Sequence, residues 1–450
     1  GYDVERFEQW DTTPTGKYAW VKKPGTPNFV PPELEILKRD MTLENPLCVL
    51  NVMKRHYDRY TPEMVAKVTG MDPDVMMKIW QVYAGTGKPG KAGALLYALG
   101  QTQHTYGGQN CRAMSIVQLL LGNIGVPGGG LNAMRGEPNV QGATDVACTV
   151  PDLPGYLKWP TAKKHRHLAD YLHTETYADG YYSNKPKFMV SFLKEFFGEN
   201  ATVENDYGYE MLPKIGPRLP ASAWTTMGTF HMMRDGRIKG YFAWGMNPAH
   251  STPNAKFARN AMANLDWLVC ADWFPTETAT FWKAPDMDPA KIQTEVYFLP
   301  AALIYEKIGS ISNSGRWVQW RQQGVLPPGE AKSDFEIIEV LFDRIRSLYQ
   351  KEGGVYPDPI LKANMDYKVD GKYDLRAVCW AINGYTVQDG KLLPGYAQLQ
   401  ADGSTACGMW IYSGYYNNEA DKLDPMKQPT ARRSKEDPSG MGLFSGWSFA

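Results

Sequence analysis

A short apolar run that leads into a polar loop and then a helical stretch most constrains the fold of this chain. Residues 92–99 (AGALLYAL) have the length and composition of a strand buried on both faces. A polar loop follows at residues 101–108, and apolar positions then recur at helical spacing from about Asn110 to Gly122. Strand, loop and helix in this order form the basic element of a parallel sheet, so we predict an α/β fold.

The same order of elements recurs in the second half of the chain. Apolar runs of strand length occur at residues 239–244, 266–271 and 295–299. Helical stretches are expected at about 253–263 and 333–350, where the latter has a broad apolar face. This recurrence predicts a second parallel α/β region after the first.

The remaining segments differ in composition from these two regions. Residues 150–235 are rich in Tyr, Lys and Pro and are interpreted as an insertion over the surface. From about residue 352 the chain is polar and rich in turn residues. Hairpins are expected there around Asp389-Gly390 and Asp402-Gly403.

Composition and charge exclude several classes of protein. Lys and Arg number 48, as do Asp and Glu, so the chain lacks the basic excess of a nucleic-acid-binding protein. No apolar run approaches the roughly 20 residues that a membrane-spanning helix needs. The six cysteines are too sparse for a disulfide scaffold and lack the spacing of a zinc or iron–sulfur motif, so we predict no metal ligand within this chain.

Three polar loops follow predicted strands, at residues 101–108, 245–252 and 272–278. Ligands of parallel α/β sheets bind at the carboxyl ends of the strands. The Asn, Gln, Thr and Asp side chains of these loops can hydrogen-bond a purine, a ribose or a diphosphate. The alternative is that they are ordinary connections, because the chain has neither a GxGxxG motif nor a P-loop.

The segment GGGLNAMRG at residues 128–136 is more specific. Its glycines allow positive φ or a close backbone approach, and Arg135-Gly136 places a rigid cation near Asn139 and Gln141. Such an arginine can grip a small carboxylate or an anionic cofactor through two hydrogen bonds. The alternative is a surface arginine in a flexible loop.

The histidines and cysteines give weaker signals. The basic run that contains His165 and His167 is interpreted as a solvated face, and His104 either contacts a ligand or has a structural role. Cys111 and Cys148 are interpreted as small buried apolar residues. No arrangement of Ser, His and Asp typical of nucleophilic catalysis can be assigned.

Ten segments of the sequence form a specific combination that spans nearly the whole chain: 95–104, 118–125, 128–136, 139–142, 154–156, 245–248, 276–278, 291–296, 309–317 and 437–440. Taken together, these segments resemble the catalytic (large) subunit of molybdopterin-dependent formate dehydrogenases, in particular the respiratory, periplasm-facing type.

The resemblance implies two Rossmann-like α/β domains that enclose the cofactor. Residues 1–136 would be the later part of the first domain, and 137–350 the second domain with the insertion at about 150–235. Residues 351–450 would be a connector toward a C-terminal cap domain. The chain is therefore expected to be the middle of a longer polypeptide.

The resemblance also implies the site. Arg135 matches the active-site arginine, which would hold formate while it is oxidised to CO2. The cofactor would be bis-molybdopterin guanine dinucleotide with Mo or W. Its expected ligands here are Gly100, Gln101, Thr102, Gln103, His104, Gly136, Gln141, Gly245, Asn247, Asp272, Thr276 and Thr278.

Two features of the family do not appear in this sequence. The Cys-rich segment for a [4Fe–4S] cluster and the selenocysteine or cysteine that binds the metal are expected before Gly1. By resemblance, electrons would pass to an iron–sulfur subunit and onward to a cytochrome or membrane subunit, and the protein would be periplasmic. A nitrate or polysulfide reductase and a non-catalytic scaffold of the same fold are the alternatives.

Overall fold

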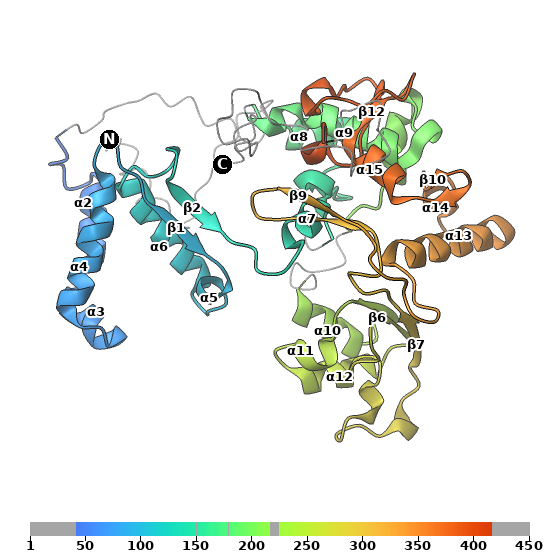
Figure 1. Cartoon of the computed structure of the whole chain (residues 1–450), viewed down its shortest axis with the longest axis horizontal. Helices are drawn as coiled ribbons and strands as arrows, with labels where there is room; N and C mark the ends of the chain where they lie inside the picture. Colours follow the sequence, from blue (N-terminus) through green and yellow to red (C-terminus); the bar gives the residue numbers. More distant parts are fainter. Residues whose placement is uncertain (1–41, 149–151, 179, 217–224, 416–450) are drawn as a thin grey trace. The chain divides into compact units, whose positions relative to one another are not determined.

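The computed structural model describes residues 42–148, 152–178, 180–216 and 225–415 (Figure 1). Backbone contacts divide the described residues into two compact units, 42–137 and 138–415. Both units mix helices with parallel strands, so the prediction of an α/β fold with parallel sheets is confirmed.

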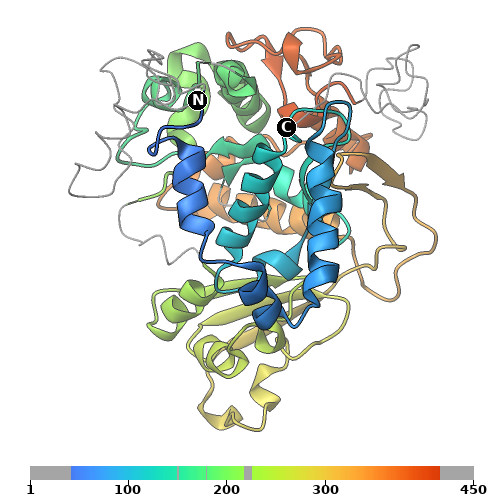
Figure 2. The same cartoon turned by 90° about the vertical axis from the view of Figure 1, so that its left-hand side faces the viewer.

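The first unit has a two-stranded parallel sheet on which a long helix packs. The strands are β1 (Ala94–Tyr97) and β2 (Gly130–Ala133), and they pair in register from Ala94 with Gly130 to Tyr97 with Ala133. Helix α6 contacts both strands. The helices, drawn in blue to teal in Figures 1 and 2, are α2 (Val49–Tyr57), α3 (Pro62–Thr69), α4 (Pro73–Ala84), α5 (Leu99–Thr102) and α6 (Gly107–Leu120).

The structure differs from expectation around β1. Its residues alternate between exposed and half-buried, and Leu96 is 66% exposed, so the prediction of burial on both faces is wrong. Among the described elements of this unit, α6 packs on the sheet, and the side chain of Leu96 stays exposed. The expected polar loop at 101–108 is also partly helical, because α5 occupies its first residues and α6 already begins at Gly107.

The second unit contains the three-stranded parallel sheet β5–β6–β7, formed by Gly240–Trp244, Trp267–Asp272 and Glu295–Pro300. Helices α10 (Thr226–Arg234) and α12 (Ala255–Met262) pack on each other in its core. The sheet and these helices are yellow-green to yellow in Figure 2. These elements fall where the sequence predicts strands and a helix.

Further helices and antiparallel strand pairs complete the described part of this unit. Its other helices are α7 (Val140–Asp145), α8 (Leu168–Glu175), α9 (Lys185–Phe197), α11 (Pro248–Ser251), α13 (Asp334–Glu352), α14 (Pro357–Leu361) and α15 (Leu375–Asn383). Its antiparallel pairs are β3 (Asp152–Leu153) with β4 (Leu157–Lys158), β8 (Gly309–Ser312) with β9 (Val318–Arg321), β10 (Lys368–Val369) with β11 (Lys372–Tyr373), and β12 (Tyr385–Thr386) with β13 (Thr405–Ala406).

The segment 150–235 is not only a surface insertion, as the sequence suggests. Its helix α9 is buried along most of its length and packs against β13. Phe188 stacks on Trp410 with ring centroids 4.2 Å apart, and Ser191 hydrogen-bonds Thr405 at 2.8 Å. Aromatic residues that look like surface cover in the sequence therefore form a core with a segment more than 200 residues away.

The two expected hairpins have different outcomes. At Asp389-Gly390 the chain reverses, and the Thr386 amide donates to the Lys391 carbonyl at 2.9 Å, which confirms the first. The turn at Asp402-Gly403 leads into β13, but β13 pairs with β12. The second prediction is therefore wrong about the pairing partner.

Candidate functional site

The segments that contain Arg135 and the loop 100–104 leave the same edge of the first sheet. The strands β1 and β2 are parallel and end opposite each other, at Tyr97 and Ala133. The Met134 amide donates to the Tyr97 carbonyl at 2.8 Å, which extends this pairing by one residue. The structure thus brings the predicted site residues of this unit to the carboxyl edge, where parallel sheets bind ligands.

The segment 100–104 is held by local hydrogen bonds. The imidazole Nε2 of His104 lies 2.7 Å from the Gly100 carbonyl, and the Asn110 side-chain Nδ2 donates to the Gln101 carbonyl at 3.0 Å. All residues from Gly100 to His104 are exposed, as are Arg135 and Gly136. Side-chain groups of this segment therefore face solvent in this chain.

Two residues separate this segment from helix α6, which begins at the buried residue Gly107. A Cβ atom at Gly107 would lie 2.1 Å from the Thr102 carbonyl oxygen, so only glycine allows this approach. The first turn of α6 has no acidic side chain and no side-chain cap. Its amide groups and the positive end of the helix dipole suit an anionic group such as a diphosphate.

The second sheet presents the other predicted residues at its own carboxyl edge. Gly245 follows β5 with φ +60°, and its amide donates to the Ala271 carbonyl of β6 at 2.9 Å. Asp272 ends β6, and its carboxylate accepts from the Trp273 amide at 2.7 Å. Thr276 follows in the next turn, half-buried.

Asn247 and Thr278 join the two loops of this edge. The Asn247 side-chain oxygen accepts from the Thr278 amide at 3.1 Å and from its hydroxyl at 2.9 Å. The side-chain Nδ2 of Asn247 donates to the Glu277 carboxylate, and this hydrogen bond lowers the pKa of the exposed Glu277 carboxyl. Glu277 is not among the residues predicted from the sequence, and its position between Thr276 and Thr278 is the signal that points to it.

We expect Thr278→Val to lower the free energy of unfolding by about 1–3 kcal/mol. Thr278 is fully buried, and its hydroxyl also accepts from the Ala249 amide at 3.0 Å, which the isosteric valine would leave unpaired. Urea denaturation measures the change. Thr278→Ser, which keeps the hydroxyl, is the control and should be the milder change; equal losses for both variants would contradict this account.

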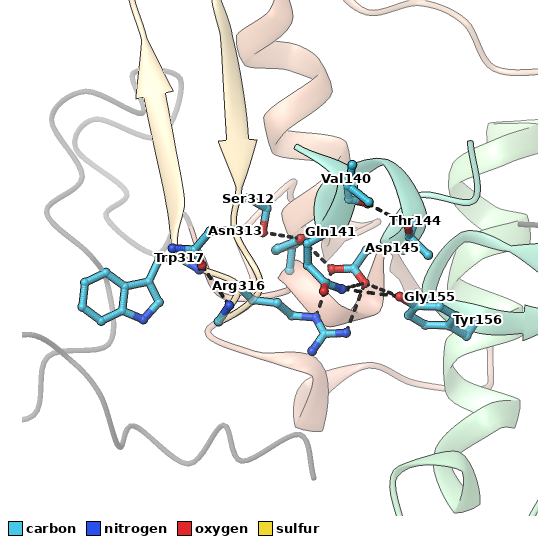
Figure 3. Close-up of polar contacts among 12 residues, drawn as sticks. Val140, Gln141, Thr144, Asp145, Gly155, Tyr156, Ser312, Asn313, Arg316 and Trp317 are labelled. Carbon is cyan, nitrogen blue, oxygen red and sulfur yellow. Dashed lines mark hydrogen bonds and ion pairs between the residues drawn. The ribbon is translucent and has the colours of Figure 1, made fainter. Parts of the chain in front are cut away.

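Gln141 lies in a different environment from the other predicted residues. It is 6% exposed, and its side-chain Nε2 donates to the Asp145 carboxylate at 2.8 Å. Figure 3 shows the side chains of Gln141, Tyr156 and Arg316 converging on that carboxylate. Asp145 and Arg316 are not among the site residues predicted from the sequence, because their pairing spans 171 positions and no local pattern indicates it.

Two weaker predictions need correction. His165 is 2% exposed, because the turn from Thr161 carries it inward, where its Nδ1 accepts from the Thr161 amide at 3.1 Å. Burial lowers the pKa of this histidine. His167 is exposed as predicted. Cys148 is exposed and Cys111 is half-buried, so the interpretation as buried apolar residues is wrong for Cys148.

In the part of the chain that the structure describes, no group of three or more His, Cys, Asp or Glu side chains is placed to hold a metal ion. Among the same residues, no helix has the length and apolarity needed to span a membrane.

Comparison with known proteins agrees with this architecture. The molybdopterin oxidoreductase family matches residues 43–344. The chain is 43% identical to the formate dehydrogenase 2 alpha subunit (cytochrome c-553) of Nitratidesulfovibrio vulgaris, over 91% of this chain and 41% of that one. It is 40% identical to the nitrate-inducible formate dehydrogenase major subunit of Escherichia coli, over 100% of this chain and 44% of that subunit.

A third relative is the formate dehydrogenase alpha subunit of Megalodesulfovibrio gigas, which is 42% identical over 92% of this chain and 42% of its own length. The chain thus spans less than half the length of these relatives. The family match covers most of the chain and includes both parallel sheets. The chain belongs to the molybdopterin oxidoreductase family.

Proposed function

We propose that this chain is part of the catalytic subunit of a formate dehydrogenase, which oxidises formate to CO2. The observation that carries the proposal is the place of Arg135, just beyond β2 at the carboxyl edge shared with β1. Relatives at 40–43% identity over at least 91% of the chain are named formate dehydrogenase subunits. This supports formate over the nitrate or polysulfide of other family members.

Arg135 would bind and orient the substrate. Formate is a one-carbon carboxylate, and a guanidinium can hold both of its oxygens through parallel hydrogen bonds. This grip aims the single C–H bond in one direction, which is the main contribution a protein makes to such a step. Oxidation converts formate to CO2, one proton and two electrons, and the bound cofactor supplies the electron acceptor.

The cofactor we infer is bis-molybdopterin guanine dinucleotide with Mo or W, and the residues present fit it. The first turn of α6 suits a diphosphate, and the hydroxyl, amide and carboxylate groups at both carboxyl edges suit a guanine and a ribose. One dinucleotide would be held by Gly100, Gln101, Thr102, Gln103 and His104. The other would be held by Gly245, Asn247, Asp272, Thr276 and Thr278. Gly136 and Gln141 are proposed as further cofactor-binding residues.

We propose the wider organisation of the protein on the same resemblance. Residues 1–136 and 137–350 would belong to the two cofactor-binding domains, and 351–450 would lead toward a cap domain. A [4Fe–4S] cluster and a selenocysteine or cysteine ligand would lie in preceding residues. Electrons would pass to an iron–sulfur subunit and then to a cytochrome or membrane subunit, in the periplasm.

The direct test uses the full-length subunit purified with its partners. We expect Mo or W by elemental analysis, together with dye reduction that depends on formate. Nitrate and polysulfide serve as alternative substrates in the matching reductase assays. Turnover of either of these without formate oxidation would replace the proposed substrate, and the absence of both metals would leave only a non-catalytic scaffold.

A further inference from the structure

Asp145 is a fully buried carboxylate at the end of α7 on which four side chains converge. One oxygen accepts from Gln141 at 2.8 Å and from the Tyr156 hydroxyl at 2.7 Å. Arg316 donates to both oxygens, at 3.0 and 3.1 Å, and the Tyr412 hydroxyl donates at 2.8 Å. We call Asp145 and these four partners the Asp145 hub; most of it is drawn in Figure 3.

The hub is made by segments that lie far apart in the sequence. Arg316 comes from the turn between β8 and β9, 171 residues after Asp145, and Tyr412 comes from 267 residues after it. The β8–β9 hairpin is also attached to the start of α7, since the Ser312 amide donates to the Asn139 side chain at 3.0 Å. The position of α7 is therefore determined by several independent contacts.

The backbone around the hub is strained at non-glycine residues. Asn139, Tyr156 and Arg316 have φ values of +63°, +57° and +56°, in the left-handed region that glycine favours. Such conformations persist only where the surroundings over-determine them, and they gather at functional sites. Here the side chains of Tyr156 and Arg316 hydrogen-bond Asp145. The side chain of Asn139 accepts a hydrogen bond from the β8–β9 hairpin.

Stability alone does not account for a buried ion pair. Removing two charges from water costs about as much as their attraction returns, so apolar side chains of the same volume would stabilise the fold equally well. Burial and the neighbouring carboxylate raise the pKa of Tyr412, so its hydroxyl keeps its proton and remains a donor. The hub holds its four donor side chains in one fixed arrangement around the Asp145 carboxylate.

Gln141 is the member of the hub that is also a proposed cofactor-binding residue. It lies on the first turn of α7, six positions after Arg135 in the sequence. Because its Nε2 is bound to Asp145, its side-chain oxygen is held on the opposite side of the amide group. The orientation of this amide is thus set by Asp145, whose own position is fixed by Arg316 together with Tyr156 and Tyr412.

We propose that Asp145, paired with Arg316, is a positioning residue that acts through Gln141 to hold the molybdopterin cofactor. The proposal rests on the proposed cofactor role of Gln141. Outer hydrogen-bond partners of this kind commonly change affinity or activity by about 10–100-fold when they are removed. Asp145 itself need not touch the cofactor.

A double-mutant cycle in the full-length holoenzyme tests this role. The readout is the rate at which metal and pterin are released during dialysis, followed by elemental analysis and pterin fluorescence. Asp145→Asn should accelerate release about tenfold when Gln141 is present. On a Gln141→Ala background the same change should add less than about twofold. Equal effects on both backgrounds would show a merely structural role and overturn the proposal.

Further variants keep the test decisive. If Asp145→Asn does not fold, Tyr412→Phe removes one donor and keeps the ion pair, and should show the same dependence on Gln141 with a smaller effect. Asp374→Asn is the matched control, because Asp374 also pairs with an arginine through both oxygens, at 3.0 Å, but lies outside the hub. Its release rate should equal that of the wild type.

The outcomes separate this proposal from the proposed function. A wild-type enzyme that holds cofactor but does not oxidise formate would refute the substrate, while the release cycle would still decide the role of Asp145. A wild-type enzyme without metal and pterin would overturn both.

Discussion

Replacing Arg135 by lysine in the full-length subunit is expected to lower kcat/KM for formate by about a hundredfold or more. A lysine keeps the positive charge, but its single ammonium group cannot reproduce the parallel hydrogen bonds of a guanidinium to both formate oxygens. The C–H bond would then no longer point in one direction. Steady-state kinetics with formate and a dye acceptor measures the loss.

The metal content of this variant should stay normal, because Arg135 is assigned to substrate and not to the cofactor. Arg55→Lys is the matched control, since Arg55 is an exposed residue of α2 in the same unit and should leave turnover unchanged. Unchanged turnover in Arg135→Lys would show that another residue binds formate. A loss of metal together with turnover would assign Arg135 to the cofactor instead.

The second large effect is expected for Gly107→Ala. The added Cβ would lie 2.1 Å from the Thr102 carbonyl oxygen, so the backbone of the segment 100–104 or the start of α6 must move. A misplacement of about 1 Å can cost a hundredfold in catalytic rate. Because the moved backbone is the proposed dinucleotide-binding segment itself, we expect the cofactor content to fall about tenfold. Elemental analysis and pterin fluorescence of the purified subunit give the content.

Gly85→Ala is the control for this substitution. Gly85 caps α4 with φ −62°, and a Cβ atom there would meet nothing within 4 Å. Cofactor content should match the wild type. Full cofactor content in Gly107→Ala would mean that the segment 100–104 does not hold a dinucleotide.

Local pattern was a good guide to the elements that carry the proposed site. Strands β5, β6 and β7 and helix α13 appear where their apolar periodicity places them, within about two residues at each end. The position of the candidate ligands follows from the same pattern, because parallel strands bring their carboxyl ends to one edge. Loop composition alone did not show that the segment 101–108 begins with α5, since polar residues and glycine are also compatible with a short helix.

Burial was harder to predict than secondary structure. The aromatic residues of α9 look like surface cover in the sequence, but their partners in 396–412 make them a core. The strand β1 looks fully buried, but the described part of its sheet leaves Leu96 exposed. Whether an apolar face is covered depends on elements elsewhere in the chain, and local periodicity does not report on them.

The sequence by itself determined the α/β architecture and the carboxyl-edge loops, because each depends on the order and spacing of neighbouring residues. The place of Arg135 came from the structure, because it depends on the pairing of β2 with β1, and the glycine-rich segment 128–136 does not predict that strand. Only the tertiary structure revealed the Asp145 hub, whose ion pair joins positions 171 residues apart. A buried carboxylate needs specific donors in three dimensions, and those donors can come from anywhere along the chain. The chemistry of single residues can therefore be predicted from the sequence, whereas the contacts that position them depend on the fold.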